Sequence, residues 1–451
     1  MSDIIAAIAT GRAPCAIGIL RLSGPGCAAL TGRVFTPKQP FADAPDRRLV
    51  LGLLHDRQGR VIDECLGVVC RAPHSYTGEE TVELQCHGSP AMLAAGLEAL
   101  LAAGARQAGP GEFTRRAFLN GKLDLTQAEA VVDLIDAETA DAAANAAGQL
   151  GGALKRAIEP VYDGLTDLCS HFHAVLDYPD EDIEDFGAAE LSGALDRAGA
   201  ALRELLATYE KGRHLRQGVR AVLLGKPNAG KSSLLNRLAG YDRVIVTDIA
   251  GTTRDTVEEP VRVGHVLLRL TDTAGIREAG DAIEALGVAR SEQAAREAEL
   301  ALFVCDASQP LTDEDRRAIE AAKCAPRSLA LCNKSDLPAA VSPDELPFDT
   351  VLTVSARTGA GLDALPAVLE GWFLGENACD GSLLTNPRQF GALDRASRAI
   401  ERAKTGLGLG VTPDAVLTDV EEAMAALGEV TGRTVREDIT NRIFERFCVG
   451  K

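Results

Sequence analysis

The sequence is short of positive charge, and it contains no long apolar run. Its 451 residues include 47 Lys and Arg against 65 Asp and Glu, so the formal net charge is −18. This balance argues against broad non-specific binding to nucleic acid, but it leaves room for a local basic patch or for a partner that supplies positive surface. No apolar run reaches the ~18 residues that a membrane span needs, and we expect no contact with a membrane.

Paired cysteines and an N-terminal targeting segment are missing as well. The 11 cysteines are scattered without any C-x-x-C pair. An odd count in a long chain predicts reduced thiols in a cytosol, and neither a disulfide framework nor a zinc site. The N-terminus has no basic region and reads straight into a strand, so the sequence predicts a cytoplasmic protein without a signal peptide.

Residues 1–119 predict a small α/β domain. Helical spacing at 90–103 follows several strand patterns, and a polar loop with one aromatic occupies 73–80. The strand patterns are short apolar or alternating runs at 16–22, 49–55, 66–71 and 81–86.

A helical texture then appears twice, at 120–217 and at 376–451, on either side of an α/β segment at 218–375. Strand patterns alternate with helices in that segment, which predicts a doubly wound parallel sheet. They lie at 219–224, 266–271, 301–305, 328–332 and 351–355. The economical interpretation is an α/β domain inserted into one discontinuous helical domain, and two independent helical modules are the alternative.

The stretch Gly225–Gly240 follows the first of these strands and opens a helical pattern. Gly225, Gly230, Lys231 and Ser232 fill the pattern G-x-x-x-x-G-K-[ST]. Such a loop turns backbone N–H groups toward phosphate oxygens, with a helix N-terminus behind them. Lys231 would neutralise the β- and γ-phosphates, and the Ser232 hydroxyl would hold Mg²⁺.

Four further motifs follow in an order that completes a guanine-nucleotide site. Asp272 could hold a water on Mg²⁺, and Thr253 could add a metal ligand. Asp336 could accept from both the N1–H and the 2-amino group of guanine, a donor pair that adenine lacks. The SAR motif at Ser355–Arg357 could offer a backbone N–H to guanine O6. The four motifs are IAGTTRD at Ile249–Asp255, DTAG at Asp272–Gly275, NKSD at Asn333–Asp336 and SAR at Ser355–Arg357. Their order and strand–loop context predict a GTPase domain.

One expected side chain is absent from this domain. Many GTPases orient the attacking water with a Gln just after D-x-x-G, and this chain has Ile276 there. An acid at Glu278, Asp281 or Glu284 could act through a second water. Alternatively, a monovalent cation near the phosphates could supply the missing charge, and the side-chain carbonyl of Asn228 suits such an ion.

Several stretches along the whole chain resemble the MnmE/TrmE family of tRNA-modifying GTPases. They are GILRLSG, YTGEETVELQCHG, FLNGKLDLTQAEAV, the GTPase motifs with Asn228, TDIAGTTRDT and the terminal CVGK. The resemblance implies an N-terminal α/β tetrahydrofolate-binding and dimerisation domain, a discontinuous helical domain and an inserted Ras-like P-loop GTPase domain. Lys226 departs from common family forms, in which Arg is frequent.

The resemblance also implies a set of site residues. Magnesium would bind Ser232 and Thr253, and Glu284 would orient or activate water. Potassium would bind Asn228, Thr247, Ile249 and Thr252. GTP contacts are expected from Asn228, Ala229, Gly230, Lys231, Ser232, Ser233, Thr247, Asp248, Ile249, Ala250, Gly251, Thr252, Thr253, Asp272, Thr273, Ala274, Gly275, Asn333, Lys334, Asp336, Ser355, Ala356 and Arg357.

At the N-terminal domain the resemblance implies a one-carbon folate, 5-formyl-tetrahydrofolate, bound by Arg21, Glu83, Lys122 and Lys451. A buried Glu83 would read the pterin edge, which shows the same donors as guanine, and the cations suit the carboxylate tail. Cys448 could act as a transient nucleophile, or it is an ordinary free thiol.

The implied function is GTP-driven formation of an aminomethyl-type group at C5 of the wobble uridine of certain tRNAs. The implied assembly is a homodimer joined by an FAD-binding MnmG/GidA-type protein in a heterotetramer. FAD and NADH then belong to that partner. One alternative is a regulatory GTPase switch in ribosome assembly. Another treats the N-terminal domain as a dimerisation module without a ligand.

Overall fold

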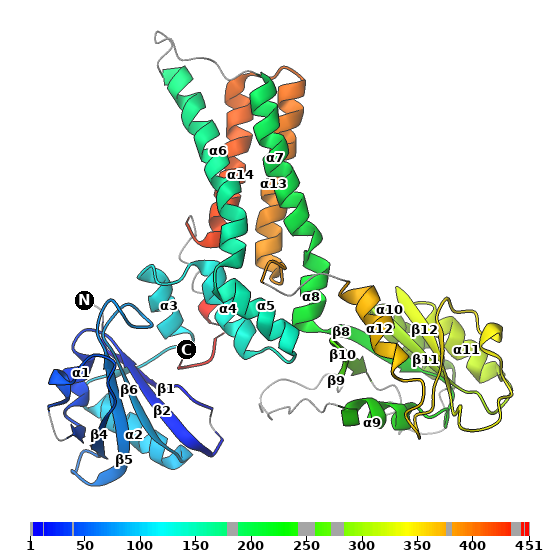
Figure 1. The fold of residues 1–451 in the computed structure, drawn as a ribbon, viewed down its shortest axis with the longest axis horizontal. Helices are drawn as coiled ribbons and strands as arrows, with labels where there is room; N and C mark the ends of the chain where they lie inside the picture. The colour runs from blue at the N-terminus through cyan, green and yellow to red at the C-terminus, as the bar shows by residue number, and fades with distance from the viewer. Residues whose placement is uncertain are drawn as a thin grey trace. The chain divides into compact units, whose positions relative to one another are not determined.

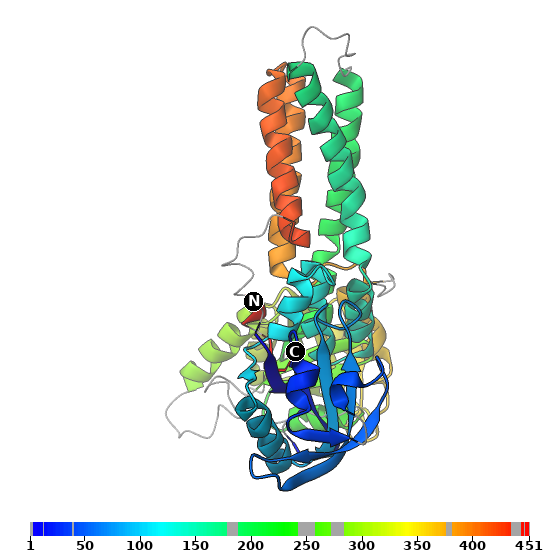
Figure 2. The same cartoon turned by 90° about the vertical axis from the view of Figure 1, so that its left-hand side faces the viewer.

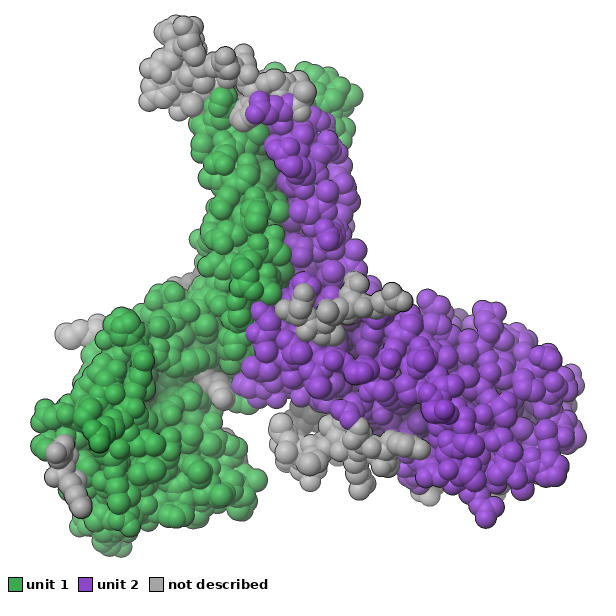
Figure 3. Space-filling model, viewed as in Figure 1, with its two compact units in different colours: residues 1–132, 150–186, 405–451 green, residues 133–149, 187–404 purple. Residues whose placement is uncertain are grey.

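The computed structural model describes residues 3–11, 13–37, 40–177, 188–241, 258–271, 284–375, 381–433, 443–445 and 447–450. Its helices and strands are drawn in Figure 1 and, from the side, in Figure 2. The chain forms two compact units, which Figure 3 colours separately. Unit 1 comprises residues 1–132, 150–186 and 405–451, and unit 2 comprises residues 133–149 and 187–404. None of the helices in the described ranges is long and apolar enough to cross a membrane.

Unit 1 contains a seven-stranded sheet in the order β3-β4-β5-β6-β2-β1-β7. All neighbours are antiparallel except the parallel pair β1–β7. The strands are β1 (Ile5–Ile8), β2 (Cys15–Ser23), β3 (Phe35–Pro37), β4 (Val50–His55), β5 (Val61–Cys70), β6 (Thr81–Gly88) and β7 (Arg106–Gln107). The expected strands are confirmed as β2, β4, β5 and β6. The pattern does not predict β3 and β7, because two or three residues are too few to show a period.

One face of this sheet packs against helix α2 (Pro90–Ala102), which confirms the helical pattern there. Leu20 and Leu22 alternate toward that face and are fully buried. Gly18 lies on the same face, where a Cβ would come within 2.5 Å of Leu93 Cδ1, so the glycine allows the helix to approach closely. The opposite face of β2 therefore carries the odd-numbered residues. The short helices α1 (Cys27–Thr31) and η1 (Phe41–Asp43) also belong to this unit.

The rest of unit 1 is helical and includes the end of the chain. Helices α3 (Glu112–Leu119) and α4 (Leu125–Ile135) follow the sheet, and α6 (Ala153–Asp177) lies beside α14 (Pro413–Thr431) in both ribbon views. Cys169 Sγ is 3.4 Å from Met424 Sδ in that pair. Phe444 and Phe447 pack against Ala128 of α4. Val449 then forms a β-bridge with Pro110, so the chain end is held near the start of α3.

Unit 2 contains a six-stranded sheet in the order β13-β12-β11-β8-β10-β9. The strands are β8 (Val219–Leu224), β9 (Glu258–Val263), β10 (Val266–Thr271), β11 (Leu300–Asp306), β12 (Arg327–Asn333) and β13 (Val351–Thr353). All five expected strands are present. The expectation of a wholly parallel sheet is wrong at one edge, because β9 runs antiparallel to β10.

The edge strand β9 has a recognisable physical signature. Pro260 removes one backbone donor, and a sheet tolerates this loss only at its edge. Val261 and Val263 alternate inward and are buried. Gly264, with φ 62°, then turns the chain back into β10. The proline obscures the alternation of apolar and polar residues in this short run, and the sequence pattern therefore does not predict the strand.

Helices cover both faces of the sheet in unit 2. One core joins Leu223 and Val304 to Leu234 of α9 (Lys231–Tyr241) and Leu365 of α12 (Ala364–Phe373). The other core joins Phe303 to α10 (Glu284–Glu297) and α11 (Asp313–Ala322). Both cores bury apolar strand residues, which explains the continuous apolar runs in β8, β11 and β12.

The remaining helices of unit 2 are α5 (Ala140–Leu150), α7 (Ala188–Ala207), α8 (Tyr209–Gln217), η3 (Pro343–Glu345) and α13 (Pro387–Gly408), the last through residue 404. Ion pairs join α7 to α13, with Arg203 Nη1 2.6 Å from Glu401 Oε1. Gln149 of α5 donates to the Leu383 carbonyl at 2.6 Å. The helical segments before and after the α/β segment therefore meet within unit 2. The domain limits 1–119, 120–217, 218–375 and 376–451 stay a prediction.

Candidate functional site

The glycine loop between β8 and α9 has the geometry of a phosphate cradle. Gly225 has φ 145°, and a Cβ there would lie 2.1 Å from the Val304 carbonyl oxygen. Asn228 has φ 62°, a region that Asn tolerates better than most residues. Lys231 Nζ lies 2.8 Å from the Gly225 carbonyl and 2.9 Å from the Lys226 carbonyl. The side chain of Lys231, which would neutralise phosphate, therefore reaches back across the loop to two of its backbone carbonyl groups.

An ion pair fixes the same loop from its other side. Lys226 Nζ is 2.8 Å from Asp315 Oδ2, and the Asp315 side chain is fully buried. Asp315 also caps α11, because its carboxylate accepts from the Thr312 backbone N–H while Thr312 Oγ1 accepts from the Asp315 N–H. Sequence reasoning missed Asp315 as part of the site. Its only signal is the T-x-x-D capping pattern, which says nothing about a partner 89 residues away.

Asn333 joins the phosphate loop to the segments expected to read guanine. Its Nδ2 donates to the Ala229 carbonyl at 2.9 Å, and its Oδ1 accepts from the Ala356 N–H at 2.9 Å. A Cβ on Gly230 would lie 2.1 Å from Asn333 Nδ2, so only glycine leaves room for this contact. Asn333 is 2% exposed. Asn333 therefore links the two loops through hydrogen bonds.

Asp336 is positioned as an ionised acceptor at the end of β12. Ser355 Oγ donates to its Oδ1 at 2.7 Å, and this hydrogen bond lowers the pKa of Asp336. Arg357 Nη1 is 3.7 Å from Oδ2 and largely exposed. Ser355 thus fixes one carboxylate oxygen, and the other faces the exposed guanidinium of Arg357.

Lys334 precedes this carboxylate in the left-handed backbone region, with φ 66°. Its Nζ lies 2.6 Å from Asp306 Oδ2 at the end of β11. Burial raises the pKa of Asp306, but the hydrogen bonds from Lys334 and Ser308 outweigh it, and the pKa is lowered overall. The ionised Asp306 therefore fixes the side chain of Lys334 within the NKSD segment.

Arg237 of α9 is a second residue that sequence reasoning missed. Its Nε is 3.2 Å from the Ala356 carbonyl, and its Nη2 is 2.5 Å from the Arg357 carbonyl. No motif includes it, and a single arginine on a helix gives no signal of this contact. The segment Ser355–Arg357 is thus tied to the helix that begins at Lys231.

The remaining predicted residues of this site fall outside the description. Thr247, Asp248, Ile249, Ala250, Gly251, Thr252, Thr253, Asp272, Thr273, Ala274 and Gly275 lie outside the described residues. Glu284 is the first residue of α10. Ser232 and Ser233 are in the first turn of α9, and Ser232 is exposed there. The structure brings together the loop, NKSD and SAR portions of the predicted set.

A second group of predicted residues meets in unit 1. Arg21 on β2 and Glu83 on β6 are direct cross-strand neighbours, and Arg21 Nε is 2.8 Å from Glu83 Oε1. The Arg21 guanidinium lies over the rings of Tyr76 and Phe113, 5.6 and 5.8 Å from their centroids. Its Nη1 is 3.4 Å from the carbonyl of Gly450, which precedes Lys451. Lys451 itself lies outside the described residues.

The expectation of a buried Glu83 needs correction. Its side chain is 29% exposed, and one carboxylate oxygen already accepts from Arg21. The alternation of β6 places Glu83 on the face of the sheet opposite α2, because Val82 and Leu84 occupy the core. Glu83 is therefore a paired, surface-accessible acid and not an isolated buried one.

The polar loop at residues 73–80 lies between these groups and helix α3. Lys122 Nζ donates to the Pro73 carbonyl at 3.2 Å. The Tyr76 hydroxyl is 2.8 Å from Thr114 Oγ1, and Asn120 Nδ2 donates to the Thr77 carbonyl at 2.7 Å. The two stretches YTGEETVELQCHG and FLNGKLDLTQAEAV, which are apart in sequence, thus build one surface.

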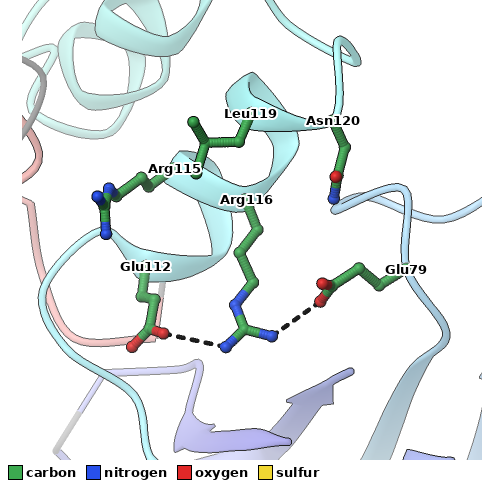
Figure 4. Close-up of a pocket in the computed structure, with 6 residues that line it drawn as sticks. All are labelled: Glu79, Glu112, Arg115, Arg116, Leu119 and Asn120. Atoms are coloured by element: carbon green, nitrogen blue, oxygen red, sulfur yellow. Dashed lines mark hydrogen bonds and ion pairs between the residues drawn. The ribbon is translucent and has the colours of Figure 1, made fainter. Parts of the chain in front are cut away.

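A pocket of about 220 Å³ opens beside this loop. Figure 4 shows Arg116 between Glu79 and Glu112, which it contacts at 2.9 and 3.1 Å. Arg115, Leu119 and Asn120 complete the lining. Cys448 is exposed, and its carbonyl accepts from the Gly111 N–H at the start of α3.

The chain is similar to known proteins over its whole length. The family model described as the MnmE helical domain matches residues 125–448, and that of the GTP-binding protein TrmE N-terminus matches residues 4–122. The tRNA modification GTPase MnmE of Roseiflexus sp. (strain RS-1) is 45% identical over 465 residues, covering 100% of this chain and 99% of the relative. That of Aquifex aeolicus (strain VF5) is 41% identical over 455 residues, covering 100% of both.

Among solved structures, the G domain of the Thermotoga maritima FeoB iron transporter matches 33% of this chain and 94% of its own, with 22% identity and a TM-score of 0.25. A score this low adds nothing to the assignment. The two family models and the full-length relatives agree with each other and with the motifs. The chain therefore belongs to the MnmE family of tRNA modification GTPases.

Proposed function

We propose that this chain is a potassium-activated GTPase that modifies tRNA. It hydrolyses GTP to GDP and phosphate, and together with an FAD-binding partner it adds an aminomethyl-type group to C5 of the wobble uridine. The observation that carries the GTPase part is the bridge that Asn333 makes between the phosphate loop and the SAR segment. Full-length similarity to tRNA modification GTPases supports the tRNA part.

Mass analysis of wobble uridine tests this function. In cells that lack this chain, the C5 side chain is expected to disappear, and the wild-type chain restores it. Lys231→Ala is expected to restore nothing, because the lysine neutralises the phosphates of GTP. Lys323→Ala removes an exposed lysine after α11 and serves as the matched control. An unchanged modification profile in the deletion cells would contradict the proposal and favour a GTPase that only times another process.

Two metal ions belong to the proposed GTPase site. Ser232 with Thr253 would hold Mg²⁺, and Asn228 with Thr247, Ile249 and Thr252 would hold K⁺. Hydroxyl and carbonyl oxygens are suitable donors for these hard cations. When bound, K⁺ supplies positive charge near the phosphates, which an arginine finger supplies in other GTPases. Glu284 would then orient the attacking water, since Ile276 cannot.

GTP turnover in KCl and NaCl tests the cation site. We expect the wild type to be at least about tenfold faster in KCl, because a cation in the role of an arginine finger is worth up to about 10³–10⁵ in rate. Asn228→Gly tolerates the left-handed backbone at φ 62° and removes the side chain together with its carbonyl oxygen. It is expected to turn over at similar rates in both salts. Equal wild-type rates in KCl and NaCl would remove Asn228 from the mechanism.

The proposed folate site lies on the outer face of the sheet in unit 1. Arg21 and Glu83 form its polar centre, with Tyr76 as an aromatic floor under the guanidinium. Lys122 and the terminal Lys451 would reach the carboxylate tail. The pairing with Arg21 means that Glu83 is held in place before any pterin arrives, which favours binding through pre-organisation.

Titration with 5-formyl-tetrahydrofolate tests this site. Binding to the wild type is expected to weaken on the order of tenfold or more in Glu83→Gln, because the pterin donors lose a charged acceptor. Glu64→Gln, an exposed acid on the neighbouring strand β5, is the matched control and should bind normally. Failure of the wild type to bind would leave the N-terminal domain as a dimerisation module only.

Homodimer formation through the N-terminal domain is part of the proposal. The outer face of the sheet exposes Leu51, Leu53 and Ile17, at 55%, 36% and 61%. Leu51 is in register with Leu66, and Gln85 separates Leu66 from Ile19, so apolar side chains occupy this face on either side of one polar residue. An apolar face of this kind supports burial against another protein. The heterotetramer with the FAD-binding partner, contact with tRNA and a cytoplasmic location complete the proposal.

A further inference from the structure

Arg237 is a basic side chain on α9 that no sequence motif includes, and its guanidinium binds the backbone of the SAR segment. Nε lies 3.2 Å from the Ala356 carbonyl oxygen, and Nη2 lies 2.5 Å from the Arg357 carbonyl oxygen. The planar fork of a guanidinium presents its donors in a fixed geometry, which suits two neighbouring acceptors. One side chain thus fixes two consecutive peptide groups.

The first of these peptide groups has a special position. The carbonyl of Ala356 and the N–H of Arg357 belong to the same planar trans peptide, so they point in opposite directions. Arg237 holds the carbonyl side. Within the described part of the chain, the Arg357 N–H has no hydrogen-bond partner. Fixing the carbonyl therefore fixes the direction of a backbone donor that is still available.

The same segment is braced from the phosphate loop by a second route. Asn333 Oδ1 accepts from the Ala356 N–H, and Asn333 Nδ2 donates to the Ala229 carbonyl. Arg237 lies six positions after Lys231 on the helix that the phosphate loop opens. One brace therefore starts from the phosphate loop and the other from the helix that follows it, and both end on the segment that would contact the base.

We propose that Arg237 is a positioning residue for guanine recognition, which aims the Arg357 N–H at O6 of the base. This inference rests on the proposed function, in which guanine is read by Asp336 and the SAR segment. Asp336 reads the N1–H and the 2-amino group, and the peptide that Arg237 holds reads O6. Different groups of the protein contact these two parts of the guanine base, so the two contacts can be tested separately.

Nucleotide analogues that change one edge atom make this separation. 6-Thio-GDP replaces O6 with sulfur, a weak acceptor, and keeps the donors that Asp336 reads. Inosine diphosphate keeps O6 and lacks the 2-amino group. In Arg237→Ala, the preference for GDP over 6-thio-GDP is expected to fall several-fold, and GDP release is expected to accelerate on the order of tenfold. The preference for GDP over inosine diphosphate is expected to stay at the wild-type value.

Two further measurements distinguish positioning from a general loss of structure. At saturating GTP, kcat of Arg237→Ala should equal that of the wild type while KM rises, because the phosphate loop is intact. Asn236→Ala, an exposed neighbour on α9, should behave as the wild type in every assay. A weakened fold would instead lower both analogue preferences and kcat together, and that result would overturn the inference.

The outcomes also separate this inference from the proposed function. A wild type that prefers GDP over both analogues, with Arg237→Ala keeping both preferences unchanged, would overturn the role of Arg237 alone. A wild type that discriminates against neither analogue would overturn guanine recognition at this site, and with it the proposed function.

Discussion

Asp336→Asn is expected to change the preferred base from guanine to xanthine. Ser355 Oγ donates to Asp336 Oδ1, so in the variant the amide oxygen should occupy that position and the amide nitrogen the other. The nitrogen would then face the N1–H and 2-amino donors of guanine, a donor–donor contact. A site built around a hydrogen bond commonly rejects a mismatched group by several orders of magnitude, and we expect GTP affinity to fall on the order of 10³-fold.

Xanthine nucleotide should gain what guanine loses, because its 2-oxo group accepts from the new amide N–H. The measurement is a competition titration of GDP and xanthosine diphosphate on both proteins. Asp349→Asn changes an exposed acid elsewhere in unit 2 and should leave the selectivity unaltered. Unchanged GDP affinity in Asp336→Asn would show that this carboxylate does not read the base.

Arg116→Met is expected to destabilise unit 1 by about 3–5 kcal/mol, because removing one partner of a buried ion pair leaves uncompensated charge. The Arg116 side chain is 10% exposed, and it contacts Asp3, Glu79 and Glu112 at 2.7, 2.9 and 3.1 Å. Arg106 still pairs with Asp3 and Glu112 in the variant. Glu79 therefore suffers the largest loss.

Amide hydrogen exchange in strands β2 and β6 of the full-length chain measures this loss of stability. Tryptophan fluorescence would not report on unit 1, because the only tryptophan in the sequence, Trp372, belongs to unit 2. Arg57→Met removes an exposed arginine and is the control. Adding Glu79→Gln to Arg116→Met should recover part of the protection, because it removes the uncompensated acid. Protection equal to the wild type in Arg116→Met would show that this network contributes little to stability.

The same network predicts how stability depends on pH. The hydrogen bond from Arg106 lowers the pKa of Asp3 to about 2, against an opposing effect of burial. For Glu112, burial raises the pKa, but hydrogen bonds from Arg106, Gly109 and Arg116 lower it overall. A group whose pKa is lower in the folded state stabilises the fold at pH values above its unfolded-state pKa. This stabilisation is lost as the pH falls through the folded-state pKa. The difference in protection between the wild type and Arg116→Met should therefore narrow as the pH falls from about 4.5 toward 2.

Contiguous motifs made part of the candidate site predictable. The phosphate loop and NKSD follow the largely buried strands β8 and β12, SAR follows the edge strand β13, and strands in a parallel sheet bring their carboxyl ends to one edge. The expected strands are therefore confirmed, and Asn333 and Ala356 meet as their order implies. The sequence pattern does not predict the edge strand β9, because Pro260 and the short length of the strand obscure its alternation of apolar and polar residues.

Residues that act through distant partners could not be found in this way. Lys226 and Asp315 are 89 positions apart, and Arg237 and Ala356 are 119 apart. Neither Asp315 nor Arg237 lies in a motif, because their function depends on which backbone or side chain the fold places opposite them. The exposure of Glu83 was mispredicted for a related reason. The sequence pattern shows that alternate residues face opposite sides, but it does not show which side remains uncovered.

The sequence by itself determined the class of chemistry. Glycine spacing, the lysine and the strand-end motifs are local requirements of a phosphate and a guanine base, and the terminal signatures identify the family. Only the tertiary structure decided how these parts hold one another: Asn333 and Arg237 on the SAR segment, Asp315 on the phosphate loop and Arg116 among three carboxylates. The physical reason is that hydrogen bonds and ion pairs act over a few ångströms, and distances of that size between remote residues exist only after folding.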